Sequence, residues 1–236
     1  VRSALAVLPQ EGVCVVVPGD APLLRTETIQ QLLAAKGEDR VALLTALLDE
    51  PARYGRMVRD ADGEASRIVE AAEASPVELA IQEINTGVYA FDIAWLRALL
   101  PTLKPHPPKG EIYVTDAVEA AAASGGVQAV IHDRADEILG VNDRWDLATA
   151  NQVLQRRVLR AHAQAGVTFE QPDTTIVEVD VELGQDAVIS TGAVLRGETR
   201  VSEGAVVGPH CVLEDTTVGK GAQILAGSIC TGAIIA

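Results

Sequence analysis

Residues 177–213 decide how the C-terminal part of the chain folds, and they read VEVDVELGQDAVISTGAVLRGETRVSEGAVVGPHCVL. Within this stretch an aliphatic residue recurs every six positions, at Val177, Leu183, Ile189, Leu195, Val201, Val207 and Leu213. This period is neither that of a strand nor that of a helix, and it is typical of a β-helix built from hexapeptide repeats. A β-sandwich with coincidental spacing is the alternative, but the unbroken register favours the β-helix.

The repeat carries a second column of mostly small residues, which we expect at the corners of a triangular, left-handed parallel coil. They follow four residues after each aliphatic position, at Val181, Ala187, Ala193, Thr199, Ala205, Cys211 and Thr217. Two five-residue steps then carry the aliphatic column through Val218, Ile224, Ile229 and Ile235, and the small column through Ala222, Ser228 and Ala233. So narrow a prism is best filled by Val, Ile and Leu, which agrees with 48% apolar but only 3% aromatic residues.

The first 142 residues have a different pattern, in which strands and helices alternate. Short apolar runs that end at turn signals predict strands over 13–17, 41–48, 84–91, 127–132 and 137–141. The first of these runs suits a strand that is buried on both faces. The intervening helices are predicted to be capped by Thr26 or Thr28, by Asp92 and by Thr115, with Gly37 ending the first helix. This alternation predicts an α/β fold with a mostly parallel sheet and helices on both faces.

A long helix is predicted over 143–165 and is expected to end at Gly166. Its apolar stripe is predicted to contain Leu147, Leu154, Val158 and Ala161. The chain is therefore predicted to have three parts: an α/β domain over 1–144, a connecting helix over 145–166 and a β-helix over 167–236.

Composition excludes several classes of protein. The 236 residues contain 19 Lys and Arg against 33 Asp and Glu, and a net charge of −14 argues against binding to nucleic acid or to an anionic membrane. No apolar run approaches the ~20 residues of a membrane span, and no secretory signal opens the sequence. Cys14, Cys211 and Cys230 have no metal-ligand spacing, so we expect a reducing, cytoplasmic setting.

Short polar motifs stand near the ends of the predicted strands. In open α/β sheets, ligands bind beyond the carboxyl ends of the strands, and both Asp20 and Asn142 fall there. The sequence shows no Ser-His-Asp arrangement, zinc-ligand spacing or Walker A loop. The scattered histidines are interpreted as surface or loop residues: His106, His132, His162 and His210. The motifs are Gly19-Asp20-Ala21-Pro22-Leu23, Tyr54-Gly55-Arg56, Ile68-Val69-Glu70, Glu83-Ile84-Asn85-Thr86-Gly87, Gly110-Glu111-Ile112-Tyr113-Val114-Thr115-Asp116 and Gly140-Val141-Asn142-Asp143-Arg144.

In order and spacing, these motifs resemble a bacterial family of bifunctional enzymes that make UDP-N-acetylglucosamine. Those enzymes combine N-acetylglucosamine-1-phosphate uridylyltransferase with glucosamine-1-phosphate acetyltransferase. The resemblance covers essentially the whole chain, and the set of motifs is far more specific than any one of them. It implies a Rossmann-like nucleotidyltransferase domain, a connecting helix and a hexapeptide β-helix, and such prisms typically associate as homotrimers.

The resemblance implies a magnesium site and a nucleotide site. Asp20 and Asn142 match the catalytic pair that holds Mg²⁺, and Gly19 matches a backbone position that lines the nucleotide. Pro18 departs from the pattern, because the family usually has a tyrosine or a small polar residue there. Proline has no N–H to donate, so a backbone N–H contact at this position is not expected.

A sugar site is implied as well. Gly55 matches a glycine whose backbone contacts the sugar, and Glu70 and Asn85 match residues that hydrogen-bond the sugar of UDP-N-acetylglucosamine. In uridylyl transfer the nucleophile is a sugar phosphate that is already anionic, so no general base is required. Mg²⁺ screens the repulsion between this phosphate and UTP, and it prefers few protein oxygens together with waters and phosphates.

The family's glycine-rich UTP-phosphate loop and its acetyl-CoA site have no match in this sequence. We therefore expect an internal part of a longer protein that is inactive alone, with the first element upstream of Val1 and the second beyond Ala236. Two alternatives stay open. One is a different sugar-1-phosphate nucleotidyltransferase with a β-helix tail, such as one that uses glucose 1-phosphate, and the other is a structural trimerisation module.

Overall fold

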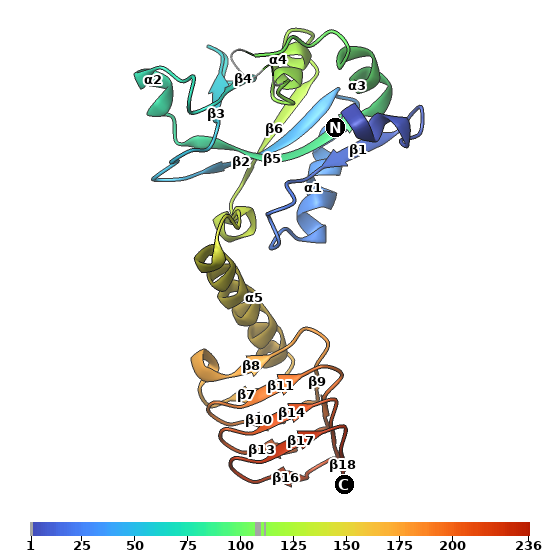
Figure 1. Cartoon of the computed structure of the whole chain (residues 1–236), viewed down its shortest axis with the longest axis vertical. Helices are drawn as coiled ribbons and strands as arrows, with labels where there is room; N and C mark the ends of the chain where they lie inside the picture. Colours follow the sequence, from blue (N-terminus) through green and yellow to red (C-terminus); the bar gives the residue numbers. More distant parts are fainter. Residues whose placement is uncertain (1, 107–109, 111) are drawn as a thin grey trace. The chain divides into compact units, whose positions relative to one another are not determined.

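The chain is described from a computed structural model that covers residues 2–106, 110 and 112–236. Glu111, which belongs to one of the sequence motifs, lies outside the described residues, and so does Val1. The chain divides into two compact units, Val1–Asn142 and Asp143–Ala236. Figure 1 shows that the first unit is a sheet with helices and that the second is a helix followed by stacked coils.

One six-stranded sheet forms the centre of the first unit. Its order is β4-β3-β5-β2-β6, and β1 pairs with β5 beside this path. Among the described strands of this sheet, only β2 and β6 pair in parallel, because β5 runs antiparallel to β1, β2 and β3 and β4 runs antiparallel to β3. The predicted mostly parallel sheet is therefore wrong. The sheet is mixed, since the reversed strand β5 is inserted between strands that share one direction. The strands are β1 (Val13–Val16), β2 (Val41–Leu47), β3 (Arg56–Arg59), β4 (Ala65–Val69), β5 (Glu83–Asp92) and β6 (Val127–His132).

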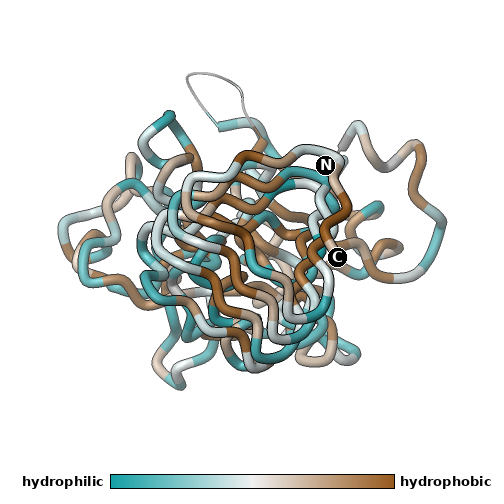
Figure 2. Tube along the Cα trace, turned by 90° about the horizontal axis from the view of Figure 1, so that it is seen from below, coloured by the Kyte–Doolittle hydropathy of each residue, from teal (hydrophilic) through white to brown (hydrophobic). Residues whose placement is uncertain are grey.

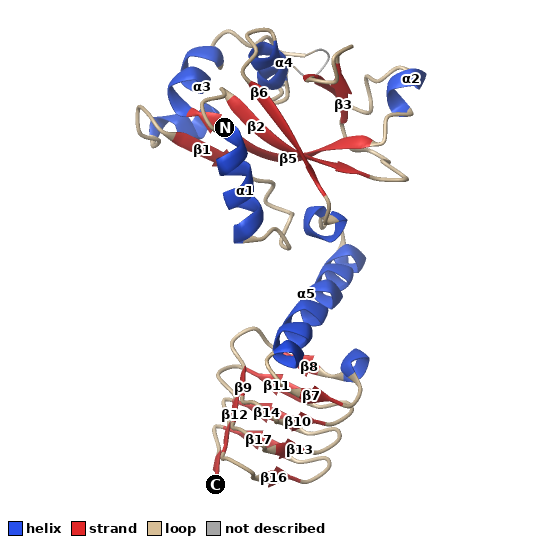
Figure 3. Cartoon of the chain, turned by 180° about the vertical axis from the view of Figure 1, so that it is seen from behind, coloured by secondary structure: helices blue, strands red, loops and turns tan. Residues whose placement is uncertain are grey.

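Helices cover both faces of this sheet, as the sequence predicts (Figures 1 and 3). On one face, α3 and α4 pack Leu96 and Val118 against Tyr89 and Phe91, whose rings stack with centroids 5.4 Å apart. On the other face, Leu32 of α1 packs against alternate residues of β2 and β5. The helices are α1 (Thr26–Lys36), α2 (Pro76–Leu79), α3 (Ile93–Leu99) and α4 (Asp116–Ala122), with 3₁₀ turns at Arg2–Ala6 and Ala135–Ile138.

The helix caps agree only in part with the predictions. Asp92 caps α3 by accepting a hydrogen bond of 2.7 Å from the backbone N–H of Trp95, and Gly37 ends α1 with a φ of 48°. The predicted cap at Thr26 or Thr28 is wrong, because Arg25 holds that position and makes no side-chain cap bond. Thr115 stands at the start of α4 but also makes no cap bond. Both Thr28 and Thr115 instead bond to distant glutamates, as described below.

Three further expectations for this unit are wrong. Residues 137–141 are not a strand: they continue from the 3₁₀ turn and fold back, so that the backbone N–H of Val141 bonds to the carbonyl of Asp20 at 2.8 Å. β1 is not buried on both faces, because it pairs with β5 alone and Val13 is 46% exposed. His132 is not a surface residue, since it is only 7% exposed.

The second unit begins with α5 (Arg144–Gln164). Gly166 follows the end of this helix and has a φ of 98°, in the left-handed region. The predicted apolar stripe of this helix is wrong in part. Leu147, Leu154 and Ala161 are exposed and Val158 is partly buried, whereas the buried residues of the helix are Ala150 and Leu159. Leu159 joins the core of the coils, because only the C-terminal turns of the helix pack on them.

Three parallel sheets of four short strands each make up the coils, which confirms the β-solenoid prediction (Figures 1 and 3). The sheets are β16-β13-β10-β7, β17-β14-β11-β8 and β18-β15-β12-β9. Figure 2 looks along the stack and shows hydrophobic positions recurring in successive coils. The strands are β7 (Thr168–Phe169), β8 (Ile176–Val177), β9 (Glu182–Leu183), β10 (Val188–Ile189), β11 (Val194–Arg196), β12 (Arg200–Val201), β13 (Val206–Val207), β14 (Val212–Glu214), β15 (Thr217–Val218), β16 (Gln223–Ile224), β17 (Ile229–Thr231) and β18 (Ile234–Ile235).

The predicted columns are confirmed up to Leu213 and are wrong in two places beyond it. The buried corner residue is Thr216, which is fully buried, and Thr217 is exposed. Cys230 stacks on Leu213 inside the coil, whereas Ile229 points outward and is 77% exposed. The second five-residue step therefore lies one repeat later than the sequence pattern suggested, since both Ile229 and Cys230 are apolar enough to fit it.

No helix within the described ranges is both long and apolar enough to cross a membrane. Cys14, Cys211 and Cys230 are all free thiols.

Candidate functional site

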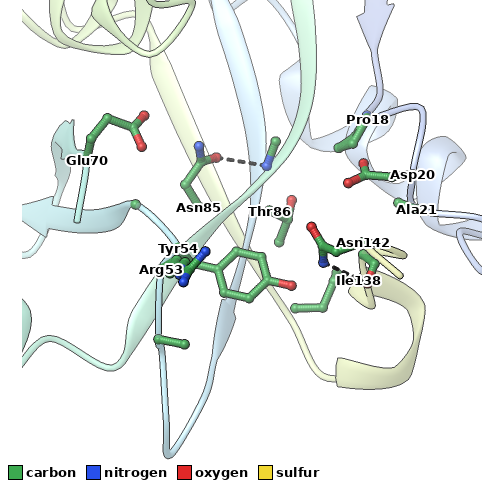
Figure 4. Close-up of a pocket in the computed structure, with 14 residues that line it drawn as sticks. Pro18, Asp20, Ala21, Arg53, Tyr54, Glu70, Asn85, Thr86, Ile138 and Asn142 are labelled. Atoms are coloured by element: carbon green, nitrogen blue, oxygen red, sulfur yellow. Dashed lines mark hydrogen bonds between the residues drawn. The ribbon is translucent and has the colours of Figure 1, made fainter. Parts of the chain in front are cut away.

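A pocket of about 650 Å³ opens on the first unit. Along β5, β1 pairs with Tyr89–Asp92 and β3 pairs with Ile84. Residues of β5 between these two pairings line the pocket. Five of the six predicted site residues line this pocket, and the sixth, Gly19, is exposed and does not. Figure 4 shows Asp20 and Asn142 on one side and Glu70 on the other, with Asn85 between them. The lining residues that were predicted are Asp20, Gly55, Glu70, Asn85 and Asn142.

Gly55, Glu70 and Asn85 form one connected group. The carbonyl of Gly55 accepts a hydrogen bond of 2.8 Å from the backbone N–H of Asn85. A methyl group added to Gly55 would lie 3.0 Å from Ile68 Cγ2 and 3.4 Å from Glu70 Oε2. The added methyl group would crowd Ile68, whereas its distance from the Glu70 carboxylate is that of an ordinary contact, so glycine is the residue that fits this buried position.

The side-chain amide of Asn85 is oriented by two hydrogen bonds. Its Nδ2 donates to the hydroxyl oxygen of Tyr89 at 2.7 Å, and its Oδ1 accepts from the backbone N–H of Gly87 at 3.1 Å. Tyr89 is only 1% exposed, and burial raises its pKa, so the ring stays neutral at physiological pH. An asparagine has two donors and two acceptor lone pairs, so one of each is left for a ligand.

Glu70 is a half-buried carboxylate with an altered pKa. Burial raises the pKa of Glu70 above its ordinary value, and the charges of Glu73 and Asp116 raise it further. The hydroxyl of Thr115 donates to Oε1 at 3.4 Å and opposes this rise. A hydroxyl group of a ligand that donated to this carboxylate would relieve the same desolvation.

Asp20 and Asn142 come from two loops that are joined by the bond from Val141 to the Asp20 carbonyl. A methyl group added at Gly140 would lie 3.5 Å from Asp20 Oδ2 and 3.9 Å from Asn142 Nδ2, so both side chains approach the same point. Nδ2 of Asn142 donates to the carbonyl of Gly140 at 3.4 Å. In Figure 4 the side-chain oxygen of Asn142 lies at the opposite end of the amide group from this hydrogen bond.

This donor set fits Mg²⁺ but not a metal held by protein ligands alone. Within residues 2–106, 110 and 112–236, no group of three or more His, Cys, Asp or Glu side chains is arranged to hold a metal. One exposed carboxylate and one amide oxygen leave most coordination positions to waters and phosphates, which is the pattern Mg²⁺ prefers.

Pro18 packs against Gly87 at the edge of the pocket. A methyl group on Gly87 would lie only 2.9 Å from Pro18 Cγ, and Gly87 has a φ of 78° that favours glycine. Pro18 therefore contributes an apolar contact at a position where the family usually has a tyrosine or a small polar residue.

Sequence reasoning missed several lining residues, namely Arg53, Tyr54 and Thr86. The loop that carries Arg53 and Tyr54 is held by the buried Arg56, whose guanidinium donates to the carbonyls of Ala52 and Tyr54. Tyr54 and Thr86 are next to predicted residues within the polar motifs, so those motifs were the available signal for them, whereas Arg53 lies outside every motif. Arg56 fell within such a motif but holds the loop rather than lining the pocket.

The chain has sequence relatives among known bifunctional proteins. No family model matches the chain. It is 44% identical over 224 residues to the bifunctional protein GlmU of Mycobacterium sp. (strain KMS), a match that covers 94% of this chain. It is 37% identical over 230 residues to the bifunctional protein GlmU of Caldanaerobacter subterraneus subsp. tengcongensis, which covers 96% of this chain. The chain is a homologue of the bifunctional GlmU proteins.

The chain spans about half the length of the curated GlmU relatives it matches, since the two alignments cover 45% and 50% of those proteins. A solved structure of a putative glucose-1-phosphate thymidylyltransferase from Bacillus anthracis has a TM-score of 0.49 to this chain, with 19% identity, over 64% of this chain and 57% of that one. The homology with GlmU confirms the resemblance inferred from the motifs, whereas the roles of single residues stay predictions.

Proposed function

We propose that the first unit belongs to a uridylyltransferase site, which transfers a uridylyl group from UTP to N-acetylglucosamine 1-phosphate and releases pyrophosphate. The observation that supports this proposal is the convergence in one pocket of Asp20, Gly55, Glu70, Asn85 and Asn142, which are far apart in the sequence. They are the same positions that the motif spacing selected, in a chain homologous to GlmU.

In this proposal the two sides of the pocket have different tasks. Asp20 and Asn142 hold Mg²⁺ together with the phosphates, and the ion, when bound, supplies the positive charge that screens the approaching anions. The phosphate of the sugar attacks the α-phosphorus of UTP and pyrophosphate leaves, so no protein group needs to remove a proton. The work of the chain is to align the two substrates.

Recognition of the sugar falls to the other side of the pocket. The Glu70 carboxylate accepts from a sugar hydroxyl, and the remaining donor and acceptor of Asn85 bond to hydroxyl or acetamido groups. Gly55 is buried but lines the pocket, and because it has no side chain it leaves room for the sugar beside Glu70. A wrong sugar would leave buried polar groups of the pocket without hydrogen-bond partners, and this cost discriminates against its binding.

A chimaera tests the reaction. The chain replaces the matching residues of the GlmU protein of Mycobacterium sp. (strain KMS), and formation of the UDP-sugar is measured with N-acetylglucosamine 1-phosphate and with glucose 1-phosphate. We expect product with the first substrate and much less with the second. Preference for glucose 1-phosphate, or no product from a folded chimaera whose parent is active, would contradict the proposal.

The solenoid is proposed to form a homotrimer. One of its three sheets presents an outward column of aliphatic side chains that stack in register, and the ends of this column are 42% and 77% exposed. Packing this face against other copies would remove apolar surface from water. Sedimentation of the purified chain should give a trimer, and a monomer at all concentrations would contradict it. The column consists of Ile176, Val194, Val212 and Ile229.

The second activity of the bifunctional relatives, for which acetyl-CoA would be the co-substrate, is not assigned to residues of this chain. We propose that the parent protein acetylates glucosamine 1-phosphate and that it works in the cytoplasm, where UTP and sugar phosphates occur and where free thiols persist.

A further inference from the structure

Glu137 is a fully buried carboxylate that the proposed reaction does not use. Its exposed fraction is 0%, although it lies in a surface segment only five residues before Asn142. A carboxylate so far from water is retained in a fold only when several donors compensate for its lost hydration. The donors that surround Glu137 show what it holds together.

Groups from three parts of the first unit converge on this carboxylate. From α1 and the residue before it, Thr28 Oγ1 donates to Oε2 at 2.6 Å, the backbone N–H of Arg25 donates to Oε2 at 3.3 Å, and Arg25 Nε lies 3.2 Å from Oε1. From its own segment, Arg134 donates to Oε1 at 3.4 Å. His132, at the end of β6, has Nε2 3.5 Å from Oε2.

These contacts join the two loops that carry the proposed magnesium ligands. Asp20 lies in the loop that runs from β1 to Arg25, and Asn142 lies at the end of the segment that contains Glu137. The loops also meet through the backbone bond from Val141 to the Asp20 carbonyl, 2.8 Å long. Glu137 joins Arg25 and Thr28, where the first loop ends, to the segment that leads to Asn142.

We propose that Glu137 is a positioning residue, which clamps the loop of Asp20 to the loop of Asn142 so that both side chains face one cation. The consequence for Mg²⁺ rests on the proposed function, whereas the clamp itself does not. A positioning role differs from a general contribution to stability, because it predicts a local effect at the junction of the two loops. The amide of Val141 reports on that junction directly.

Hydrogen exchange in the metal-free chain tests the clamp at the Val141 amide. Glu137→Gln keeps the shape but removes the charge, and Thr28→Val removes only the shortest of the donors. We expect exchange at Val141 to become about 10-fold faster in both variants, the scale on which hydrogen bonds to charged groups contribute. Thr28→Ser retains a hydroxyl and is expected to keep the protection of the original protein.

Glu83 offers a matched control. It is also a buried carboxylate, 8% exposed, and it accepts from Thr45 Oγ1 at 2.6 Å and from the guanidinium of Arg59 at 2.7 and 2.8 Å. Glu83→Gln should lower the melting temperature as Glu137→Gln does, yet leave exchange at Val141 unchanged. Unchanged exchange at Val141 in Glu137→Gln and Thr28→Val would overturn the proposal, and so would equal acceleration throughout β2 and β5.

Calorimetric titration of the same proteins with N-acetylglucosamine 1-phosphate separates the clamp from the proposed function. With Mg²⁺ present, Glu137→Gln should bind about 10-fold more weakly than the original chain, while in EDTA the two should bind alike. If the original chain gains no affinity from Mg²⁺, the proposed function is wrong and the exchange result still decides on the clamp. If Mg²⁺ strengthens binding equally in both proteins, Glu137 does not position the magnesium ligands, and that part of the proposal is wrong.

Discussion

The two units of this chain use sequence in opposite ways. In the solenoid each residue packs against residues one coil away, so a short repeat specifies the interior, and Val188 pairs with Val206 as Val194 pairs with Val212. In the α/β unit the pocket gathers side chains from loops that no repeat connects. The buried residues of the solenoid can therefore be deduced from local periodicity, whereas the binding site depends on how distant loops are joined.

The largest effect is expected from Leu195, which is fully buried in the middle of the solenoid. Leu195→Ala should lower the free energy of unfolding by about 2–5 kcal/mol, because it deletes buried methyl groups and leaves a cavity. Chemical denaturation measures this change, and calorimetry with N-acetylglucosamine 1-phosphate should show unaltered binding in the other unit. Weakened ligand binding would show that the two units are less independent than the comparison suggests.

Ile229 provides the control for Leu195 and tests the corrected register. Ile229→Ala removes a similar number of methyl groups from a side chain that is 77% exposed in the single chain, so at protein concentrations where the chain is monomeric less than about 0.5 kcal/mol should be lost. A loss as large as that of Leu195→Ala would show that Ile229, and not Cys230, faces the interior.

In the α/β unit the largest effect is expected on activity. Asp20→Asn in the chimaera should reduce uridylyl transfer by on the order of 10²-fold or more, since it removes the charged ligand of the proposed Mg²⁺ site. The melting temperature should hardly change, because Asp20 is exposed. If the variant unfolds more easily while transfer per folded molecule persists, Asp20 merely closes a turn.

The same contrast explains which parts of the fold and of the candidate site could be predicted from the sequence. The solenoid interior was predicted up to Leu213, and the error at Ile229 arose because two adjacent apolar residues fit the pattern equally well. The mixed sheet could not be deduced, because the reversal of β5 depends on pairing with strands far along the chain. Five pocket residues were selected by the spacing of motifs, but nothing local in the sequence showed that Thr28 and Thr115 bond to buried or half-buried glutamates.

A smaller effect is expected from crowding the sugar side of the pocket. Gly55→Ala places a methyl group 3.0 Å from Ile68 Cγ2 and 3.4 Å from Glu70 Oε2, so affinity for N-acetylglucosamine 1-phosphate should fall by about 10-fold. Gly19→Ala is the control, because nothing lies within 4 Å of the added methyl group. Titration calorimetry compares the two variants, and equal losses would argue against a sugar site at Gly55.

The smallest effect is expected in the pH dependence of sugar binding. Because burial raises the pKa of Glu70, the carboxylate takes up a proton at a higher pH than an ordinary glutamate does. A protonated Glu70 accepts a sugar hydroxyl less well, so affinity should fall a few-fold as the pH is lowered through this raised pKa. Glu70→Gln should bind weakly at every pH and remove the dependence.

The stability of the protein should respond to Glu70 in the opposite direction. The folded chain binds the proton of Glu70 more tightly than the unfolded chain does, so this residue makes unfolding easier as the pH rises from the ordinary to the raised pKa. Thermal unfolding of the original chain and of Glu70→Gln across this range measures the difference. A difference of the reverse sign would mean that the pKa is lowered.

The pairing of β1 with β5 bears on the order in which the molecule assembles. Val13 pairs with Asp92, so much of the sequence of the first unit lies between the two partners. In the coils, each strand pairs with a strand only about one turn later in the sequence. Closing a long loop loses more chain entropy and is slow, so low contact order lets the coils form early. The loop that carries Asp20 directly follows β1. We therefore expect the side of the pocket that Asp20 forms to be among the last parts of the protein to acquire its native structure.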